Sequence, residues 1–466
     1  IKWRLPMRMH ATTAETRPSS SLNRILRALA QPFVTLMQRW MPDAFVFALA
    51  LTVLTFVLAV TVADYSVMSA INSWGGHLWD LLAFMSQIAL TLITGYALAH
   101  TPLVHGLLNR TASTVSSATG AYALVCFVGM LASLFSWAVG LIVGAIIARE
   151  TANACLERGI KVHYPLLVAS AYSGFVVWHQ GLSSSVGLAI ATPNHFLADM
   201  MGIVPVSETI FSSWNLTIVA AVLLTLPFVM MMLCPSDQDC VEIDHKLEGE
   251  DDAAPRVRTE TPAERIENSR IFNLVIGSAG LIFLAYYFLV GEGSLNLNIV
   301  NLIFLISGIL LTSSPKHYVS LIADGGRTLG PILVQYPFYA GIMGIMLDSG
   351  LAKITAAWFV SISTAATLPV WSMISGGLIN IFIPSGGGQW AVQGPIMIEA
   401  AKTLGADIPR VAMGVAIGDQ WTNMIQPFWT IPALAIAGLH VRDILGYCVI
   451  ALIWTGLIFA GGLLFL

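Results

Sequence analysis

Two polar interruptions in otherwise apolar sequence hold the residues of this chain that could do chemistry. WHQGLSSS contains His179 four residues before Ser183, and GDQWTNMIQPFW contains Asp419. Either ionisable group can carry a proton, and a carboxylate within a long apolar stretch is costly enough to indicate function. A satisfied interior histidine and a structural cap are the alternative interpretations. The spacing of His179 and Ser183 would also suit a hydrolase, but no acidic orienting residue or oxyanion site accompanies them, so we predict that the chain is not an enzyme.

The segment PSGGGQWAVQGP places three consecutive glycines, Gly386, Gly387 and Gly388, within apolar sequence. Such a run breaks a helix, and bare backbone at membrane depth persists only where protein or a cavity satisfies it. A helix that begins there presents free N–H groups and a partial positive charge. No arginine or lysine lies near the middle of any interrupted segment, which favours a small monoanion as ligand. Close helix packing is the alternative reason for the glycines.

The composition predicts which elements position these residues. Apolar residues make up 56% of the 466 residues and charged residues only 10%, which is typical of a multi-span helical membrane protein. The segments that fit one ordinary crossing are 43–63, 78–99, 209–233, 271–290, 296–313, 326–347 and 443–466. Five scattered cysteines without a CxxC pair indicate neither zinc nor disulfides, and we expect no cofactor, no metal site and no nucleic acid partner.

Four further apolar segments do not fit a single crossing. They are 118–148, 164–198, 366–398 and 408–438. Arg110 and Arg149 flank the first of them, and because basic residues stay cytoplasmic, a single crossing would leave one of the two outside. The first is therefore predicted to be a re-entrant hairpin, and the third a hairpin entered from outside. The second and fourth contain the polar interruptions and are predicted to be broken spans.

The two halves of the chain match each other over whole elements. At an offset of 248, Gly129 meets Gly377 and Gly140 meets Gly388, and at 244 Gly174 meets Gly418. This register pairs hairpin with hairpin and broken span with broken span. The span 271–290 has no partner in the first half, so its extra crossing reverses everything after it. Inverted repeats of this kind are typical of secondary transporters with a site near the membrane midplane.

The predicted fold is an all-α polytopic membrane protein with two inverted repeats, each holding one re-entrant hairpin and one broken span. Its parts are a basic cytoplasmic amphipathic segment 1–42, a first membrane repeat 43–233, a charged cytoplasmic linker 234–270, and an extra span with the second repeat 271–466. A fixed scaffold is predicted from residues 43–63, 209–233, 271–313 and 443–466.

The hairpin tips and the broken spans are expected to face one another and form the site. The predicted substrate-binding residues are Ser136, Trp137, His179, Ser183, Ser184, Ser385, Gly386, Gly387, Gly388, Gln389, Trp390, Asn423 and Gln426. The residues predicted to hold a coupling ion are Asp419, His179, Asn423 and Ser385.

At these residues the sequence resembles the bacterial short-chain fatty acid transporter family. The motifs that carry the resemblance are PSGGGQWAVQGP, GDQWTNMIQPFW, LAIAGLHVRDILGYC, ILVQYPFYAGI and YPLLVASAYSGF. The first half departs from the family pattern, with Ser136 and Ala138 where asparagine and glycine are expected and His179, Gln180 and Ser184 where glycines are usual. The resemblance implies carriers of acetoacetate and butyrate in the bacterial cytoplasmic membrane, and by analogy an elevator movement of a transport domain against a scaffold.

The predicted function is secondary active transport of small monocarboxylates such as acetate, butyrate or acetoacetate, coupled to a proton on Asp419 or His179. Sodium held by Ser385, Asn423 and Asp419 is the alternative coupling ion, so sodium is the one metal ion that remains open. A passive channel and an intramembrane hydrolase rank lower. The expected partners are the lipid bilayer, the substrate, the coupled ion and further copies of the chain, with the N-terminus in the cytoplasm.

Overall fold

A computed structural model describes residues 44–235, 240–243, 245–247 and 261–466, and over these residues the secondary structure is entirely helical. The expected basic segment 1–42 lies outside the described residues. The first half contains α2 (Ala44–Thr61), α3 (Val67–His77), α4 (Leu82–Ala99), α5 (Pro102–Ala112), α6 (Ala118–Phe135), α7 (Trp137–Glu157), α8 (Tyr164–Ser173), the 3₁₀ helix η1 (Gly174–Gln180), α9 (Ala198–Met201) and α10 (Ser213–Met232). The second half contains α11 (Pro262–Glu267), α12 (Arg270–Leu289), α13 (Leu297–Leu311), α14 (Pro315–Gly326), α15 (Gly330–Asp348), α16 (Leu351–Ile362), α17 (Leu368–Asn380), α18 (Gly386–Leu404), α19 (Ile408–Thr422), η2 (Asn423–Ile425), α20 (Pro427–Ala437) and α21 (Val441–Phe465).

Seven helical stretches of the described chain are long and apolar enough to cross a membrane. They are Leu82–Ala99, Ala118–Phe135, Trp137–Glu157, Ser213–Met232, Pro262–Leu289, Gly330–Asp348 and Val441–Phe465. Three shorter apolar helices accompany them, and lipid-exposed backbone needs such internally bonded helices. The chain is therefore a multi-pass helical membrane protein.

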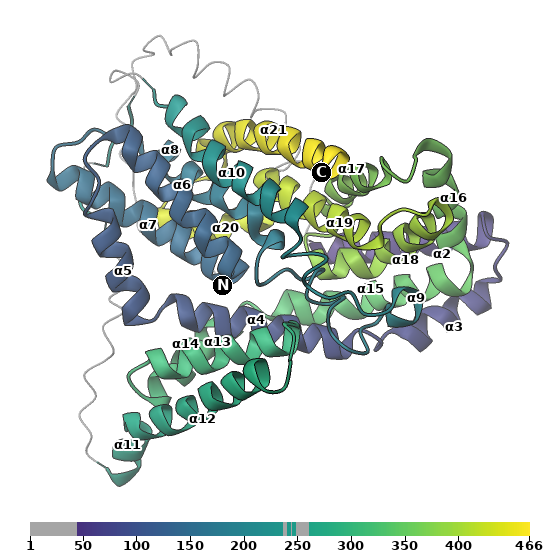
Figure 1. Ribbon diagram of the computed structural model, residues 1–466, viewed down its shortest axis with the longest axis horizontal. Coiled ribbons are helices and arrows are strands. Elements are labelled where there is room, and N and C mark those ends of the chain that lie inside the picture. The colour runs from purple at the N-terminus through teal and green to yellow at the C-terminus, as the bar shows by residue number, and fades with distance from the viewer. Residues whose placement is uncertain (1–43, 236–239, 244, 248–260) are drawn as a thin grey trace.

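An outer group of helices, α2, α3, α4, α12, α13, α14 and α15, contains contacts between the two halves of the chain. Helix α15 packs on α2 and α3, while α4 packs on α13 and α14, and α12 packs on α13 at the edge of the molecule (Figure 1). Gly277 and Gly280 of α12 leave the space that Leu310 and Ile306 of α13 occupy. The remaining surface of α12 carries apolar side chains such as Ile282, which is 70% exposed, as expected of a surface in contact with lipid.

The inner group contains the hairpins and the broken spans. Helix α6 packs against α7, α8 and η1, and α17 packs against α18 and α19. Helices α10 and α21 lie beside each other on this group, α10 against α6 and α21 against α8 (Figure 1). The predicted scaffold included 209–233 and 443–466, and in the structure the corresponding helices α10 and α21 pack on the hairpins and broken spans.

Paired glycines bring the backbones of the inner group into contact. A Cβ atom on Gly174 would lie 2.5 Å from the carbonyl carbon of Gly129, and one on Gly418 would lie 2.8 Å from the backbone nitrogen of Gly377. Neither distance is possible for a real side chain, so only glycine permits these crossings. The two contacts are equivalent in the internal sequence match, which sets Gly129 against Gly377 and Gly174 against Gly418.

Each predicted hairpin and broken span is interrupted where the sequence indicated a break. Ser136, in extended conformation, is the single residue between α6 and α7, which lie side by side, and residues 381–385 separate α17 from α18. The second broken span continues as a helix, α20, beyond its break. The first does not, because residues after η1 form turns up to α9. Correspondence between the halves therefore ends at this break.

The described part of the linker lies along the ends of α7 and α8. The N–H of Tyr164 donates to the carbonyl of Val241 (2.9 Å). The Asn153 side chain accepts from the N–H of Leu247 (2.9 Å) and donates to its carbonyl (3.0 Å). These described residues of the predicted linker are thus bonded to the inner group.

His77, outside the candidate spans, lies between two carboxylates. Its Nδ1 is 2.5 Å from Asp80 Oδ2 and its Nε2 is 3.3 Å from Asp348 Oδ2, at the end of α15. Partial burial disfavours the charged imidazolium, but the hydrogen bonds and charges of Asp80 and Asp348 outweigh it and raise the pKa of His77 above its ordinary value. Protonated His77 therefore links the end of α3 to the end of α15.

Candidate functional site

Two ionisable side chains meet in the interior of the protein. His179 lies in η1 and Asp419 in α19, and His179 Nε2 is 3.2 Å from Asp419 Oδ2, with both side chains fully buried. The backbone N–H of His179 donates to Oε1 of Gln420, the next residue of α19 (2.7 Å), so the two elements are bonded at this level. The polar interruptions that the sequence singled out thus form one site.

The first residue of α18 lies directly on this pair. A Cβ atom on Gly386 would be 2.2 Å from His179 Nε2 and 2.8 Å from Ser185 Oγ. Ser385 is the N-cap of the helix, and its hydroxyl accepts from the N–H of Gly388. Glycine at position 386 therefore lets the helix N-terminus, with its free N–H groups and partial positive charge, reach the imidazole.

The outer helices hold the tip of the second hairpin. The hydroxyls of Tyr336, on α15, and Ser385 are 3.0 Å apart. Gly387 lies against the ring of Phe84, on α4, and Gly388 against the ring of Tyr339, with ring atoms 2.5 Å from the position of an added Cβ in each case. The tip therefore packs between α4, from the first half of the chain, and α15, from the second.

Several polar atoms at the site are buried without a hydrogen bond among the described residues. Apart from Nε2 of His179 and Oδ2 of Asp419, which contact each other, they are Oδ1 of Asp419, Oγ of Ser185, Oδ1 of Asn380 and Nδ2 of Asn423. Leaving such groups unpaired costs about 1–3 kcal/mol each. Clustered unpaired donors and acceptors indicate a site that binds a polar ligand, an ion or a proton.

Amide side chains form hydrogen bonds on either side of the pair of His179 and Asp419. Gln420 Nε2 donates to Gln180 Oε1 (3.0 Å), and Gln180 Nε2 donates to Asn215 Oδ1 (2.9 Å), which ties η1 to α10. On the other side, Asn380 Nδ2 donates to the carbonyl of Asp419 (2.9 Å), and Gln426 Nε2 donates to the carbonyl of Asn380 (2.9 Å). These bonds fix η1 to α10 and the end of α19 to α17, and so position the site residues.

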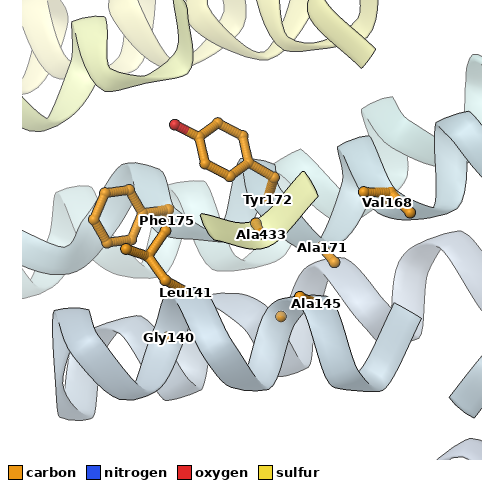
Figure 2. A pocket seen from close by; sticks show the side chains of 9 residues that line it. Gly140, Leu141, Ala145, Val168, Ala171, Tyr172, Phe175 and Ala433 are labelled. Carbon is orange, nitrogen blue, oxygen red and sulfur yellow. The ribbon is translucent and has the colours of Figure 1, made fainter. Parts of the chain in front are cut away.

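A small apolar cleft lies between α7, α8 and α20, close to the first hairpin tip. Figure 2 shows the residues that line it, among them Leu141 and Ala145 from α7, Ala171 from α8 and Ala433 from α20. Its volume is ≈ 10 Å³, about that of one water-sized sphere. The cleft is lined by small and aliphatic side chains and by the rings of Tyr172 and Phe175.

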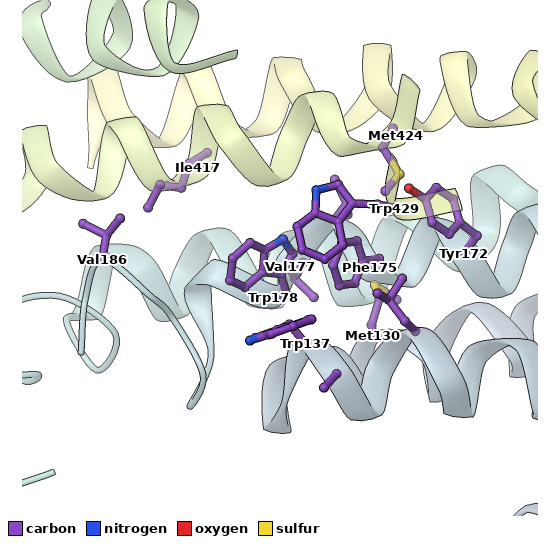
Figure 3. Close-up of a cluster of buried hydrophobic side chains, with 14 of the residues drawn as sticks. Met130, Trp137, Tyr172, Phe175, Val177, Trp178, Val186, Ile417, Met424 and Trp429 are labelled. Carbon is purple, nitrogen blue, oxygen red and sulfur yellow. The ribbon is translucent and has the colours of Figure 1, made fainter. Parts of the chain in front are cut away.

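The tip of the first hairpin is enclosed by aromatic rings. The N–H of Trp137, the first residue of α7, donates to Ser183 Oγ (2.7 Å). The Trp137 ring contacts those of Trp178 and Trp429, at centroid distances of 6.3 and 5.5 Å (Figure 3). The Trp178 ring in turn stacks on the imidazole of His179, with ring centroids 3.5 Å apart. The aromatic cluster is therefore continuous with the ionisable pair.

The structure divides the predicted site residues into three sets. His179, Ser184, Ser385, Gly386 and Asp419 lie at or next to the pair, with Ser184 Oγ 3.3 Å from His179 Nδ1. The second set holds the hairpin tips or the break between α19 and α20. It contains Ser136, Trp137, Ser183, Gly387, Gly388, Asn423 and Gln426.

The remaining two residues, Gln389 and Trp390, lie on α18 beyond its first turn. Gln389 donates to the carbonyl of Gly376 (2.8 Å) and to Gln393 (3.1 Å), within the contact between α17 and α18. Trp390 is fully buried. Four residues next to the site were absent from the predicted set: Ser185, Tyr336, Asn380 and Gln420. The motif ILVQYPFYAGI contains Tyr336 and was the available signal for it.

The fold places the chain in a structural class. It is similar to the crystal structure of the Alcanivorax borkumensis YdaH transporter, with a TM-score of 0.59 and 16% identity over 91% of this chain and 97% of that one. It is also similar to Neisseria gonorrhoeae MtrF, a protein reported as illuminating a class of antimetabolite efflux pumps, with a TM-score of 0.53 and 16% identity over 94% and 96% of the two chains. The chain has the helical fold of these transporters.

The chain belongs to the short chain fatty acid transporter family, whose sequence profile matches residues 25–466. It is 44% identical over 427 residues to an Escherichia coli (strain K12) protein, covering 91% of this chain and 96% of the relative. It is 40% identical over 442 residues to one from Haemophilus influenzae, covering 93% and 98%. Both relatives carry the name "Putative short-chain fatty acid transporter". The family predicted from the motifs is confirmed.

Proposed function

We propose that this protein is a secondary active transporter that carries small monocarboxylates, such as acetate, butyrate or acetoacetate, together with a proton across the bacterial cytoplasmic membrane. Membership of the short chain fatty acid transporter family supports this substrate class. The observation that carries the coupling is the buried contact of His179 with Asp419 against the N-terminus of α18. A group that can hold a proton and a helix end that can bind an anion thus lie at one place.

The carboxylate of the acid would bind at the beginning of α18, in contact with the backbone at Gly386 and the hydroxyls of Ser385 and Ser185. The Ser185 hydroxyl is buried and has no hydrogen-bond partner among the described residues. With no lysine or arginine in this cluster, the anion would enter without a fixed positive partner. One proton on the pair of Asp419 and His179 would balance its charge and make the passage electroneutral.

We propose that the two halves are inverted repeats and that the inner group moves against the outer group, as in an elevator. Equivalent packing in the two halves supports this: α4 packs on α7 as α15 packs on α18, and α6 packs on α8 as α17 packs on α19. The matching glycine contacts described above support it as well. The hairpin tips lie on α4 and α15, which would form the surface along which the inner group slides.

Sodium is the second candidate for the coupled ion. Oδ1 of Asp419 and Oδ1 of Asn380 are buried and accept no hydrogen bond from the part of the chain that the structure describes. Oxygen atoms at broken helices bind sodium in other transporters. Proton coupling is preferred because the imidazole of His179, which can itself hold a proton, faces the Asp419 carboxylate.

Counterflow in proteoliposomes tests substrate and coupling together. Labelled acetate, butyrate and acetoacetate would be presented with and without sodium and with and without a pH gradient, and protein-free vesicles would correct for undissociated acid that crosses the lipid. We expect saturable counterflow and uptake driven by the pH gradient. Absence of counterflow for every short acid would contradict the proposed function. Sodium-dependent uptake at clamped pH, without response to a proton gradient, would contradict proton coupling.

The predicted topology has its own test. We propose that α6 and α7 form a re-entrant hairpin, that the N-terminus is cytoplasmic and that the protein forms homo-oligomers. Single cysteines at positions 110 and 150 should then be labelled from the same face of the membrane. Labelling from opposite faces would make 118–148 a simple span.

A further inference from the structure

The hydroxyl of Tyr336 lies against the N-terminus of α18. It is 3.0 Å from Oγ of Ser385, the N-cap residue, and a Cβ atom added to Gly387 would lie 3.0 Å from it. The first N–H groups of a helix have no acceptor within the helix and are available to an oxygen atom of a ligand or of a neighbouring side chain. The phenol thus already holds the Ser385 hydroxyl, to which the carboxylate of the acid is proposed to bind.

This contact joins the two groups of helices that are proposed to move against each other. Tyr336 belongs to α15, in the outer group, and Ser385 to the tip of the second hairpin, in the inner group. The Tyr336 side chain is 2% exposed, and its ring packs on those of Phe84 and Tyr339, both in the outer group, at centroid distances of 5.9 and 6.0 Å. Because the ring is held by the outer group, the hydrogen bond to Ser385 must break whenever the inner group moves.

We propose that Tyr336 is a positioning residue that holds the empty carrier in place through Ser385, and that binding of the acid releases this latch. The inference rests on the proposed function and deepens it by naming the contact through which substrate binding permits movement. Hydrogen bonds to a carboxylate are roughly twice as strong as those to a neutral hydroxyl, so the acid displaces the phenol from Ser385. The ligand favours the released form because it replaces the contact that stabilises the latched form.

The latch slows the movement of the empty carrier relative to that of the loaded carrier. Exchange of internal for external acid uses the loaded carrier in both directions. Net uptake also needs the empty carrier to return, and for this the hydrogen bond between Tyr336 and Ser385 must break without help from a substrate. Wild-type protein should therefore exchange the acid faster than it takes it up.

Tyr336→Phe tests the latch, because it keeps the buried ring and removes only the hydroxyl. Initial rates of exchange and of net uptake of labelled butyrate would be measured in proteoliposomes at equal pH on both sides, with protein-free vesicles as the correction for passive entry. We expect the ratio of exchange to net uptake to fall about fivefold, the factor that corresponds to one hydrogen bond. The half-saturating concentration of butyrate should also fall, because the acid no longer competes with the phenol.

Tyr339→Phe is the matched control. It removes a hydroxyl from another fully buried ring of α15, but this hydroxyl donates to Oε1 of Gln335 in the same helix (3.1 Å), so the control should keep the wild-type ratio. Ser385→Ala removes the other half of the contact and remains informative if Tyr336→Phe does not fold. It should lower the ratio as well, but raise the half-saturating concentration, because Ser385 also binds the acid.

Two results would overturn the latch and leave the transport function intact. One is an unchanged ratio in folded Tyr336→Phe or Ser385→Ala, or equal rates of exchange and net uptake in wild-type protein. The other is a higher half-saturating concentration in Tyr336→Phe, which would make the Tyr336 hydroxyl a ligand of the acid. Wild-type protein that exchanges no short acid would instead refute the proposed function.

Discussion

Replacement of Asp419 by asparagine is the most direct test of how transport is coupled. The substitution keeps the shape of a fully buried side chain and removes its charge, 3.2 Å from His179 Nε2. Asparagine cannot take up and release a proton near neutral pH. We expect Asp419→Asn to abolish uptake driven by a pH gradient and to leave exchange of internal for external acid partly intact, because exchange needs no net proton movement.

The structure gives the scale of this effect. Opposite charges 3.2 Å apart attract by about 5 kcal/mol at an effective dielectric constant of about 20. A gradient of one pH unit supplies about 1.4 kcal/mol to each coupled proton, which allows at most a tenfold accumulation of the acid. Asparagine holds no proton, and protonated His179 loses the attraction of the carboxylate, so neither group carries the coupled proton and the accumulation ratio should fall to about one.

The assay compares initial uptake under a pH gradient with counterflow at equal pH. Undissociated short acids also follow a pH gradient across bare lipid, so both rates are taken relative to protein-free vesicles. Asp348→Asn is a matched control, since Asp348 is 40% exposed and contacts His77, which lies outside the site. His179→Gly should do less damage than Asp419→Asn. Gradient-driven accumulation by Asp419→Asn at the wild-type rate would refute the assignment of the proton to this pair.

Three further predictions follow from the packing. Gly386→Ala should reduce uptake at least tenfold, because its Cβ would lie 2.2 Å from His179 Nε2, whereas Gly330→Ala, in open space, should not; equal uptake rates would contradict this. Asn153→Ala removes two hydrogen bonds to the linker and should speed its proteolysis several-fold in detergent, with unchanged cleavage as the contrary result. Because its pKa is raised, His77 contributes stability that is fully present below about pH 6.5 and is lost as the pH rises through the raised pKa. His77→Gln should therefore flatten the fall in thermal unfolding temperature between pH 6 and 9. An unchanged slope would contradict the link between His77 and stability.

Local rules account for the features that could be predicted from the sequence. Long apolar segments predicted the helices, and the helix-breaking PSGGGQWAVQGP motif predicted the gap between α17 and α18. The prediction failed where a helix depends on its neighbours. The segment 164–198 was predicted to be a broken span equivalent to 408–438, but after its break it forms turns where 408–438 continues as α20. Gln180 bonds this break to Asn215 of α10, a contact that the second half does not repeat among the bonds that hold its break to α17.

The sequence by itself determined that this is a helical membrane protein, where its helices break and to which family it belongs, since composition and local motifs are enough for each. Only the tertiary structure decided that His179 touches Asp419, that Tyr336 holds Ser385, and that α10 and α21 pack with the hairpins. Each of these is a contact between helices far apart in the chain. Such contacts depend on how helix surfaces fit together, with glycine pairs setting the closest approaches, and no local pattern of residues specifies that fit.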